Sequence, residues 1–506
     1  MDCIITIEIG TSHVRAVAFK LNGQIIDSRK GTYPTFHPLP HYSEQDPEQV
    51  FVTFLNVVRG LISEKIRPQK YNISAIGFSA AMHSVLPVDE KGVPLTNVMI
   101  WSDNRAKKEA ESLKSSPQGK SIYQATGTPI HPMSPLVKIA WIKNENPEVF
   151  NRTHKFISLK EYILFQLTGS YYIDYSLASA TGLFNITELN WEEQSLAFAG
   201  INADKLSQPV PVLFSGLKIR KGFRGMFALS AATKIIIGAS DGCLATFGAA
   251  GRGKGRATVT LDTTGAVRII DKKQLHTEDR QFFNYLLFEG CFVSGGPTNN
   301  GGSVFEWFNR QFLRNTGFSD YDAAFSKMFS EAAQVPPGSA GLIFLPYLLG
   351  ERAPLWNANA RGSYFGININ HKKKHFVRAT VEGVIYELFS IGKLLQEHRP
   401  IKELYVNGYL ATLPFLSQLI ADVFNKPVHV NSSTDSSATG LFFLLATELG
   451  IFNSLEEASV ADSSYRIFTP NTSDNVVYMR YYEVFERLSN KLTEEFELIA
   501  KLQQGV

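Results

Sequence analysis

Hydrophobic and polar residues alternate in two distinct patterns along the chain. Short apolar runs typical of β-strands occur at 4–9, 14–19, 74–79 and 98–102, and longer runs with helical spacing occur at 47–65, 104–114 and 135–143. The second half repeats this plan, with strand-like runs at 257–261, 266–270 and 403–406 and helical patterns near 302–313, 376–398, 412–424 and 436–449. Because strands and helices are mixed in both halves, the pattern predicts two α/β domains.

The chain is too long for one ordinary hydrophobic core. With 506 residues it is expected to fold into more than one domain. The glycine-rich stretch 248–256 has the composition of a hinge or loop, so we predict a first domain over residues 1–247 and a second over 248–506. The C-terminal stretch 478–503 predicts one amphipathic helix that packs back on a domain.

One strand-turn-strand pattern occurs twice, once at the start of each half. Residues 4–19 and 256–270 come into register when Gly10-Thr11-Ser12 is laid on Asp262-Thr263-Thr264. Each copy has the form of a β-hairpin with a hydroxyl-bearing turn. Backbone N–H groups and hydroxyls at such a turn form a concave site for phosphate oxygens, so two facing copies could hold a nucleotide triphosphate. Two unrelated hairpins are the alternative.

Composition and charge narrow the class of protein. The content of 44% hydrophobic and 19% charged residues is that of a globular protein, and the net charge of +3 is too small to predict a nucleic-acid partner. Three scattered cysteines, Cys3, Cys243 and Cys291, have no metal-ligand spacing and favour a reducing cytoplasm. The apolar stretch 441–446 is far too short for a membrane span, and the N-terminus has no signal-peptide pattern, so no membrane association is expected.

Asp241 is the candidate general base. It follows an apolar β run in the sequence GASDG, where small neighbours let a substrate approach and a carboxylate can accept the proton of an attacking hydroxyl. The alternative is an aspartate that caps the helix after it, since Asp is a common N-cap residue.

Further polar side chains follow two other strand-like runs. Met82 and His83 lie in GFSAAMHS, and Trp101, Asp103 and Arg105 lie in IWSDNR. Ligands of α/β folds gather outside the carboxyl ends of the strands, so these residues are candidates for a sugar site, with Trp101 as an apolar face. His83 or Arg105 could also bind a substrate carboxylate. Alternatively, Asp103 and Arg105 form a cap and an ion pair at the start of a helix.

These segments resemble one known family almost from end to end. The hairpin IGTS, the segments EQDPEQVF, SAAMHS, IWSDNRA and MSPLVKIAWIKNE, and then GASDG, GGPTNNGG, GERAPLWNANARG and SSATGL are similar to motifs of the FGGY carbohydrate kinases. Within that family, TGTPIHPMSP, ISLKEYILFQLTG and DYSLASATGLFNI are most similar to gluconokinases. The resemblance implies an ATP-dependent sugar kinase that phosphorylates the 6-hydroxyl of D-gluconate, with another sugar, polyol or sugar acid as the alternative acceptor.

The resemblance also implies the fold and the residues of the site. The expected fold is α/β, with two ribonuclease-H-like domains of the actin and hexokinase type and a cleft between them. Asp241 would be the catalytic base, and the sugar would contact Met82, His83, Trp101, Asp103, Arg105 and Met133. ATP would contact Gly10, Thr11, Ser12, Arg15, Thr263, Thr264, Gly265, Gly302, Gly408 and Thr412, and Glu8 would hold Mg²⁺ through water. Family members are often dimers, so a homodimer is expected.

Three residues depart from the family pattern in the nucleotide motifs. Glu8 replaces an aspartate, Asp262 replaces the first glycine of the second hairpin, and Asn407 replaces the first of two glycines in the adenosine motif. A longer carboxylate could displace the metal, and a carboxylate beside a triphosphate is repulsive unless it points away or joins the metal site. Two interpretations are therefore open: an active kinase with an altered nucleotide site, and a sugar-acid-binding protein of kinase fold with weak catalysis.

Overall fold

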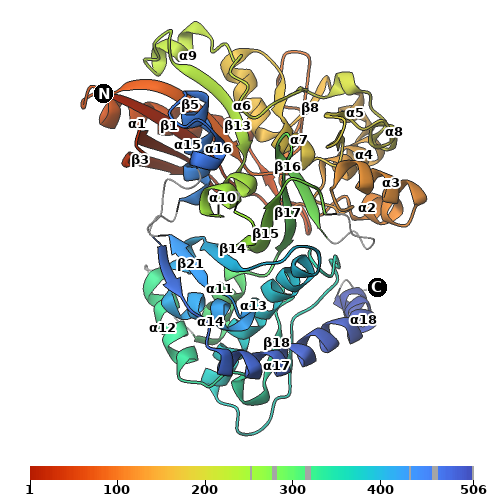
Figure 1. The fold of residues 1–506 in the computed structure, drawn as a ribbon. Coiled ribbons are helices and arrows are strands. Elements are labelled where there is room, and N and C mark those ends of the chain that lie inside the picture. Colours follow the sequence, from red (N-terminus) through yellow and green to blue (C-terminus); the bar gives the residue numbers. More distant parts are fainter. Residues whose placement is uncertain (251–252, 276–281, 314–320, 432–434, 459–464, 504–506) are drawn as a thin grey trace.

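The chain folds into two lobes, each built around one twisted sheet (Figure 1). The computed structural model describes residues 1–250, 253–275, 282–313, 321–431, 435–458 and 465–503. Residues 251–252 of the predicted hinge lie outside these ranges.

The first sheet has five strands in the order β13-β5-β1-β2-β3. They are β1 (Asp2–Ile9), β2 (His13–Lys20), β3 (Ile25–Thr32), β5 (Asn72–Ala80) and β13 (Lys234–Ser240). β1, β2 and β3 are antiparallel neighbours, whereas β5 runs parallel to β1, and β13 runs parallel to β5. The apolar runs predicted at 4–9, 14–19 and 74–79 all lie in this sheet, which explains their nearly continuous burial.

The second sheet repeats this topology and adds an edge strand at each side, in the order β16-β17-β15-β14-β20-β21-β22. Its strands are β14 (Arg256–Leu261), β15 (Gly265–Asp271), β16 (Phe283–Phe288), β17 (Cys291–Thr298), β20 (Glu403–Asn407), β21 (Val428–Asn431) and β22 (Tyr465–Phe468). β14, β15 and β17 form the antiparallel part, and β20 and β21 run parallel to β14. The duplicated arrangement confirms the predicted pair of ribonuclease-H-like domains.

Two helices lie where the lobes meet. α10 (Asp241–Ala250) follows β13, and α15 (Ser436–Glu448), which comes late in the chain, packs against α10 and against β1 and β5 of the first sheet. Figure 1 shows this blue helix among the red strands of the first lobe. Buried residues from both halves, including Ile4, Ile236 and Leu441, share one core there. The shared core fixes the start of α10 relative to both sheets.

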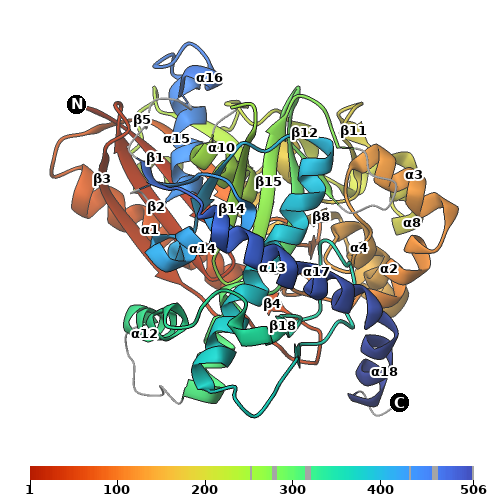
Figure 2. The same cartoon turned by 60° about the horizontal axis from the view of Figure 1, so that its bottom comes forward.

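The other helices pack on the sheets or on one another. In the first lobe they are α1 (Pro47–Leu61), α2 (Lys107–Lys114), α3 (Pro117–Thr126), α4 (Pro135–Glu145), α5 (Pro147–Arg152), α6 (Leu159–Thr168), α7 (Tyr175–Ser179), α8 (Glu193–Ala199) and α9 (Lys221–Met226). In the second half they are α11 (Gly302–Phe308), α12 (Tyr321–Ala333), α13 (Lys373–His398), α14 (Pro414–Phe424), α16 (Leu455–Ala458), α17 (Thr472–Lys491) and α18 (Thr493–Gln503). Figure 2 shows α17 and α18 as a bent arm that reaches the C-terminal end of the described chain.

Three predicted elements are wrong in detail. The predicted strand at 98–102 is only β7 (Val98–Met99), because the N–H of Asp103 donates to the carbonyl of Ile100 over 3.0 Å and closes a turn. The predicted helix at 104–114 begins only at Lys107. The single C-terminal helix predicted at 478–503 is divided into α17 and α18, because Leu492 leaves helical geometry with φ −90° and ψ 11°.

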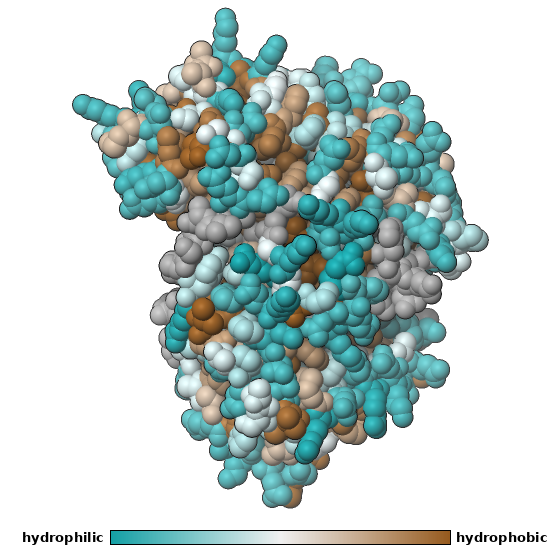
Figure 3. Space-filling model, viewed as in Figure 1, coloured by the Kyte–Doolittle hydropathy of each residue, from teal (hydrophilic) through white to brown (hydrophobic). Residues whose placement is uncertain are grey.

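The surface is mainly hydrophilic on the face that Figure 3 shows. On the face shown in Figure 3, hydrophilic residues surround scattered hydrophobic ones. Among the described residues, no helix is both long and apolar enough to cross a membrane.

Candidate active site

Asp241 lies where β13 ends and α10 begins, between the two lobes. Its Oδ1 accepts the N–H of Gly242 over 2.6 Å. Burial raises the pKa of Asp241 to about 6, although the N–H of Gly242 and the guanidinium of Arg268 act in the opposite direction. Asp241 is thus the first residue of a helix and also a carboxylate that is ionised at neutral pH, as a general base requires.

Met82 and Arg268 approach the start of α10, beside Asp241, from opposite lobes. A Cβ atom placed on Gly242 would lie 3.0 Å from Cε of Met82 and 3.2 Å from Nη2 of Arg268. Met82 follows β5, and Arg268 projects from β15 opposite Gly295 of β17. The sequence reasoning did not select Arg268, although an arginine within the apolar run GAVRII was a usable signal.

His83 connects the two lobes. Its Nε2 lies 3.2 Å from the hydroxyl of Tyr285 on β16, and its ring centroid lies 5.4 Å from that of Phe283. Burial, followed by the charges of Lys138 and Arg352, holds the pKa of His83 well below its usual value, so the imidazole is neutral. Sequence reasoning missed Tyr285 and Phe283, because an aromatic residue in a strand is more often part of a core.

Trp101 is in contact with both the first hairpin and the second lobe. Its indole N–H donates to Oγ1 of Thr11 over 2.9 Å, and the guanidinium carbon of Arg352 lies 5.1 Å from the ring centroid. Arg352 is buried and donates through Nη2 to the carbonyl of Thr298 over 3.0 Å, whereas its Nε has no hydrogen-bond partner in the described part of the chain. Burial lowers the pKa of Arg352 only to about 10, so it carries a positive charge at neutral pH.

Met133 and His131 lie near the aromatic residues of this region. Met133 is buried in the same core cluster as Phe283 and Tyr285, with Trp101 packed against that cluster. The ring of His131 lies 5.7 Å from Trp356, and burial lowers the pKa of His131 to about 3.

Asp103 and Arg105 form an ion pair with each other. Arg105 Nη2 lies 2.6 Å from Oδ2 of Asp103 and 2.5 Å from Oε1 of Glu44, and its guanidinium carbon lies 3.6 Å from the centroid of Tyr42. Asp103 also accepts the N–H of Ser43 over 2.7 Å. These contacts confirm the ion pair of the alternative interpretation but not its cap, because the N-cap residue of α2 is Ala106 and no side chain caps this helix. A direct sugar contact stays a prediction.

The two predicted phosphate hairpins are both present. Gly10, Thr11 and Ser12 form the turn between β1 and β2, where Tyr33 donates to the carbonyl of Gly10 and Gln45 to that of Thr11. In the second hairpin, which turns at Asp262, Thr263 and Thr264 before Gly265 begins β15, the carbonyls of Asp262 and Thr263 accept the N–H groups of Gly302 and Ser303 over 2.6 and 3.0 Å. The first turn of α11 is thereby held against the second hairpin.

Asp262 points away from the turn of its hairpin and toward the adenosine motif. Its Oδ1 accepts the N–H of Tyr409 over 2.7 Å. Gly408, just before, has φ +96°, and Asn407 donates through Nδ2 to the carbonyl of Ala245 over 3.4 Å. Thr412 ends the short helix η5 (Tyr409–Thr412), and its side chain lies outside the described part of the structure.

Carboxylates gather between the hairpins. Burial raises the pKa of Glu8 to about 8, the charges of Asp241, Asp435 and Asp262 add to this effect, and Arg15 opposes it. Arg15 Nη2 lies 2.8 Å from Oδ2 of Asp435, which precedes α15. No three His, Cys, Asp or Glu side chains of the described residues are close enough to hold a metal ion by themselves.

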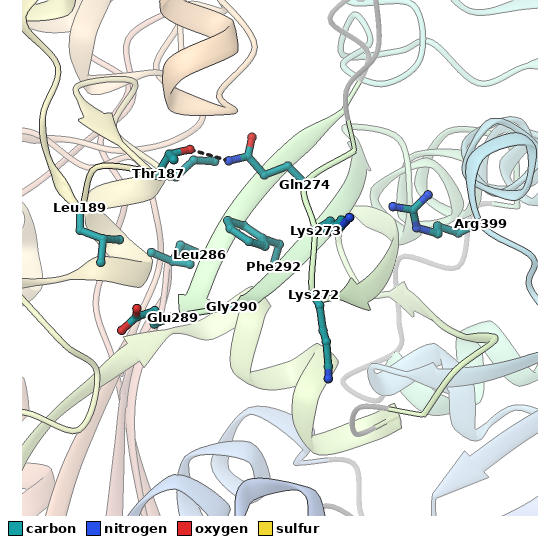
Figure 4. Close-up of a pocket in the computed structure, with 11 residues that line it drawn as sticks. Thr187, Leu189, Lys272, Lys273, Gln274, Leu286, Glu289, Gly290, Phe292 and Arg399 are labelled. Carbon is teal, nitrogen blue, oxygen red and sulfur yellow. Dashed lines mark hydrogen bonds between the residues drawn. The ribbon is translucent and has the colours of Figure 1, made fainter.

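One open cavity lies away from these residues. It is an open groove of about 430 Å³ whose apolar floor includes Leu286 and Phe292 (Figure 4). Gln274 donates to Thr187 across it over 3.1 Å, and Arg399, at its rim, is paired with Asp271. It contains none of the predicted site residues, so we place the active site at Asp241 instead.

Comparisons with known proteins agree with this geometry. The chain matches the FGGY family of carbohydrate kinases, with the N-terminal domain over residues 3–248 and the C-terminal domain over residues 257–448. The gluconokinase of Bacillus subtilis (strain 168) is 39% identical over 99% of this chain and 98% of its own. Two Lactobacillus acidophilus structures, a ligand-bound xylulose kinase and a gluconate kinase, each superpose with a TM-score of 0.91 at 31% identity, over 99% and 98% of this chain and 100% and 99% of theirs. The chain therefore belongs to the FGGY family of carbohydrate kinases, phosphotransferases that act on an alcohol group.

Proposed function

We propose that this kinase transfers the γ-phosphoryl group of ATP to the 6-hydroxyl of D-gluconate. The relative named gluconokinase and the solved gluconate kinase, both matched over nearly the whole chain, support this acceptor. In the proposed reaction Asp241 accepts the proton of the 6-hydroxyl as that oxygen bonds to the γ-phosphorus. The bond to the bridging oxygen breaks, and ADP leaves with its electron pair.

The charge of Arg352 is the observation that carries the choice of a sugar acid. This buried guanidinium has no ion pair with a carboxylate of the described chain, and neither has Arg268. Buried charges in proteins are normally paired, and a guanidinium suits a carboxylate. A sugar acid would give this guanidinium a carboxylate partner in addition to the charge of the neighbouring Glu351, whereas xylulose or glycerol would not.

The remaining site residues position the reactants. We assign Met82, Trp101 and Met133 to the carbon chain of the acceptor, and His83 and Tyr285 to its hydroxyls. The amides and hydroxyls around Thr11 and Thr263 face the phosphates, as the two hairpins suggest. Positioning and charge stabilisation supply most of the catalysis of phosphoryl transfer.

Mg²⁺ fits this site through water. Glu8 and Asp241 repel each other, and this repulsion falls when a divalent cation lies between them and the nucleotide. Mg²⁺ keeps several waters and takes only one or two carboxylates together with substrate phosphates, which suits a site without three close protein ligands. We propose Glu8 as the water-mediated ligand; the bound ion would neutralise charge on the phosphates.

ADP release from Mg²⁺-ATP, measured with D-gluconate, D-xylulose, glycerol and L-ribulose, tests the proposal. Turnover with gluconate alone supports it. Turnover with xylulose instead would keep the mechanism and replace the acceptor, as the equal similarity to a xylulose kinase structure allows. Gluconate binding in calorimetry without turnover would favour the sugar-acid-binding interpretation.

The cellular setting and assembly follow as further proposals. All three cysteines are buried, which suits the reducing cytoplasm. We retain residues 1–247 and 248–506 as the two domains, and a homodimer as the assembly that light scattering would test.

A further inference from the structure

Lys138 carries a buried amino group that the proposed reaction does not use. It lies on α4 with no measurable exposure, and its Nζ donates to the carbonyl of His83 over 2.9 Å and to that of Ile100 over 2.6 Å. No carboxylate within the described ranges forms an ion pair with it. The amino group therefore donates to two main-chain carbonyls, and each lies in a segment that carries residues of the proposed acceptor site.

Both carbonyls belong to backbone that needs external support. His83 has φ +68°, a left-handed conformation that a non-glycine residue adopts only where its surroundings enforce it. The carbonyl of Ile100 also accepts the N–H of Asp103 over 3.0 Å, which closes the turn that contains Trp101. Burial lowers the pKa of Lys138 to about 7, and both the protonated and the neutral amine have enough N–H donors for two carbonyls, so Lys138 is suited to hold both turns.

We propose that Lys138 is a positioning residue of the acceptor site. By joining the carbonyls of His83 and Ile100, it sets the imidazole of His83 against Tyr285 and the indole of Trp101 against Thr11. The inference rests on the proposed function only in placing His83 and Trp101 beside the acceptor. A loss of Lys138 should therefore misplace groups around the acceptor without removing any group that touches it.

The test compares Lys138→Met with Lys155→Met. Lys155, which is half-buried, is the control because it too donates to two main-chain carbonyls over 2.6 and 2.8 Å, but those of Asp204 and Leu206, which lie in none of the segments that carry site residues. We expect Lys138→Met to lower kcat/KM for gluconate by about 10-fold or more, the scale of a misplaced reacting group, with a smaller change in the KM for ATP. Lys155→Met should leave kcat/KM for gluconate within about 2-fold. Equal losses in the two variants would overturn the proposal.

A second comparison separates positioning from general destabilisation. In a His83→Gly background, glycine adopts the left-handed conformation without strain, so Lys138→Met should cost less in kcat/KM than it does beside His83. The same cost in both backgrounds would also overturn the proposal. If Lys138→Met does not fold, Lys138→Gln is used instead, because its side chain keeps one NH2 donor group. Its loss in kcat/KM for gluconate should be smaller than the loss expected for Lys138→Met. If the wild type phosphorylates xylulose and not gluconate, the proposed acceptor fails, and the same comparisons are made with xylulose.

Discussion

The indole N–H of Trp101 donates to the hydroxyl of Thr11 across 2.9 Å. This bond joins the acceptor side of the site to the first phosphate hairpin, and the guanidinium of Arg352 lies over the same indole ring. One side chain of the proposed acceptor site thus contacts the first hairpin and the second lobe. The bond orients Thr11, whose hydroxyl would otherwise rotate freely.

Trp101→Phe removes this hydrogen bond and keeps an aromatic face for the acceptor. A neutral hydrogen bond contributes about 1 kcal/mol, so we expect kcat to fall by about 5-fold. The KM for gluconate should change little, because the ring surface is retained. Steady-state kinetics with each substrate varied in turn checks this, and a rise in the KM for gluconate with an unchanged kcat would contradict it.

Asp241→Asn keeps the shape of the side chain and removes its basicity. Loss of a general base typically costs about 10²–10⁴-fold, so kcat should fall by that amount while gluconate still binds. Rapid-quench kinetics and calorimetry on the same preparation measure the two effects. Near-normal turnover would exclude Asp241 as the base.

The pH profile should report the ionisation of Asp241. Because burial raises its pKa to about 6, kcat/KM should fall as the pH drops through about 6, where the base becomes protonated. The contribution of Asp241 to the free energy of unfolding changes with pH in the opposite direction. Because the pKa is raised in the folded state, this contribution is fully present below the pKa of the unfolded state and is lost as the pH rises through about 6. Asp241→Asn should show a low, flat profile over the same range.

The sequence patterns selected candidate site residues after the parallel strands of the first lobe, but not Arg268 and Tyr285 of the second lobe. Asp241, Met82 and His83 follow parallel strands, and the position after such a strand is where ligands bind in these folds. Arg268 and Tyr285 instead lie within strands β15 and β16, so they reach the site only because the second sheet faces the first lobe. That arrangement depends on helix packing between the lobes, which no local pattern reports.

The fold itself could be predicted because its pattern is local and repeated. Each half contains a hairpin followed by parallel strands and helices, and the apolar runs mark them. The contacts of single polar residues could not be predicted in this way. Asp103 and Arg105 were candidates for sugar binding, but the ion pair of Arg105 with Glu44 depends on a residue 61 positions away in the sequence.

Binding of Mg²⁺ with ADP should release protons from Glu8. The pKa of Glu8 is raised to about 8 by burial and by neighbouring carboxylates, and a cation held by Glu8 favours its ionised form. The affinity should therefore increase as the pH rises toward about 8. Calorimetry in two buffers with different ionisation enthalpies counts the protons, and Glu8→Gln is the control that should release fewer.

Glu8→Asp should keep equal or higher activity, since the shorter carboxylate is the family residue. Complete loss of activity would mean that the site requires the longer side chain.

Asp262→Gly restores the residue usual in the family, yet we expect it to weaken nucleotide binding. The carboxylate of Asp262 accepts the N–H of Tyr409 over 2.7 Å and so ties the second hairpin to the turn after Gly408. A hydrogen bond to a charged group contributes about 1.5–3 kcal/mol, although exposure of this bond to solvent places the expected loss at the lower end, about 10-fold in the KM for ATP.

Asp262→Asn is the matched variant, because its amide oxygen can still accept the N–H of Tyr409 while the charge is removed. If support of the turn is the main effect, the Asn variant should have a KM for ATP close to that of the wild type, and the Gly variant a higher one. If repulsion of the triphosphate is the main effect, both variants should bind ATP more tightly than the wild type. The contact with Tyr409 turns the carboxylate of Asp262 toward the adenosine motif, so we expect the first result.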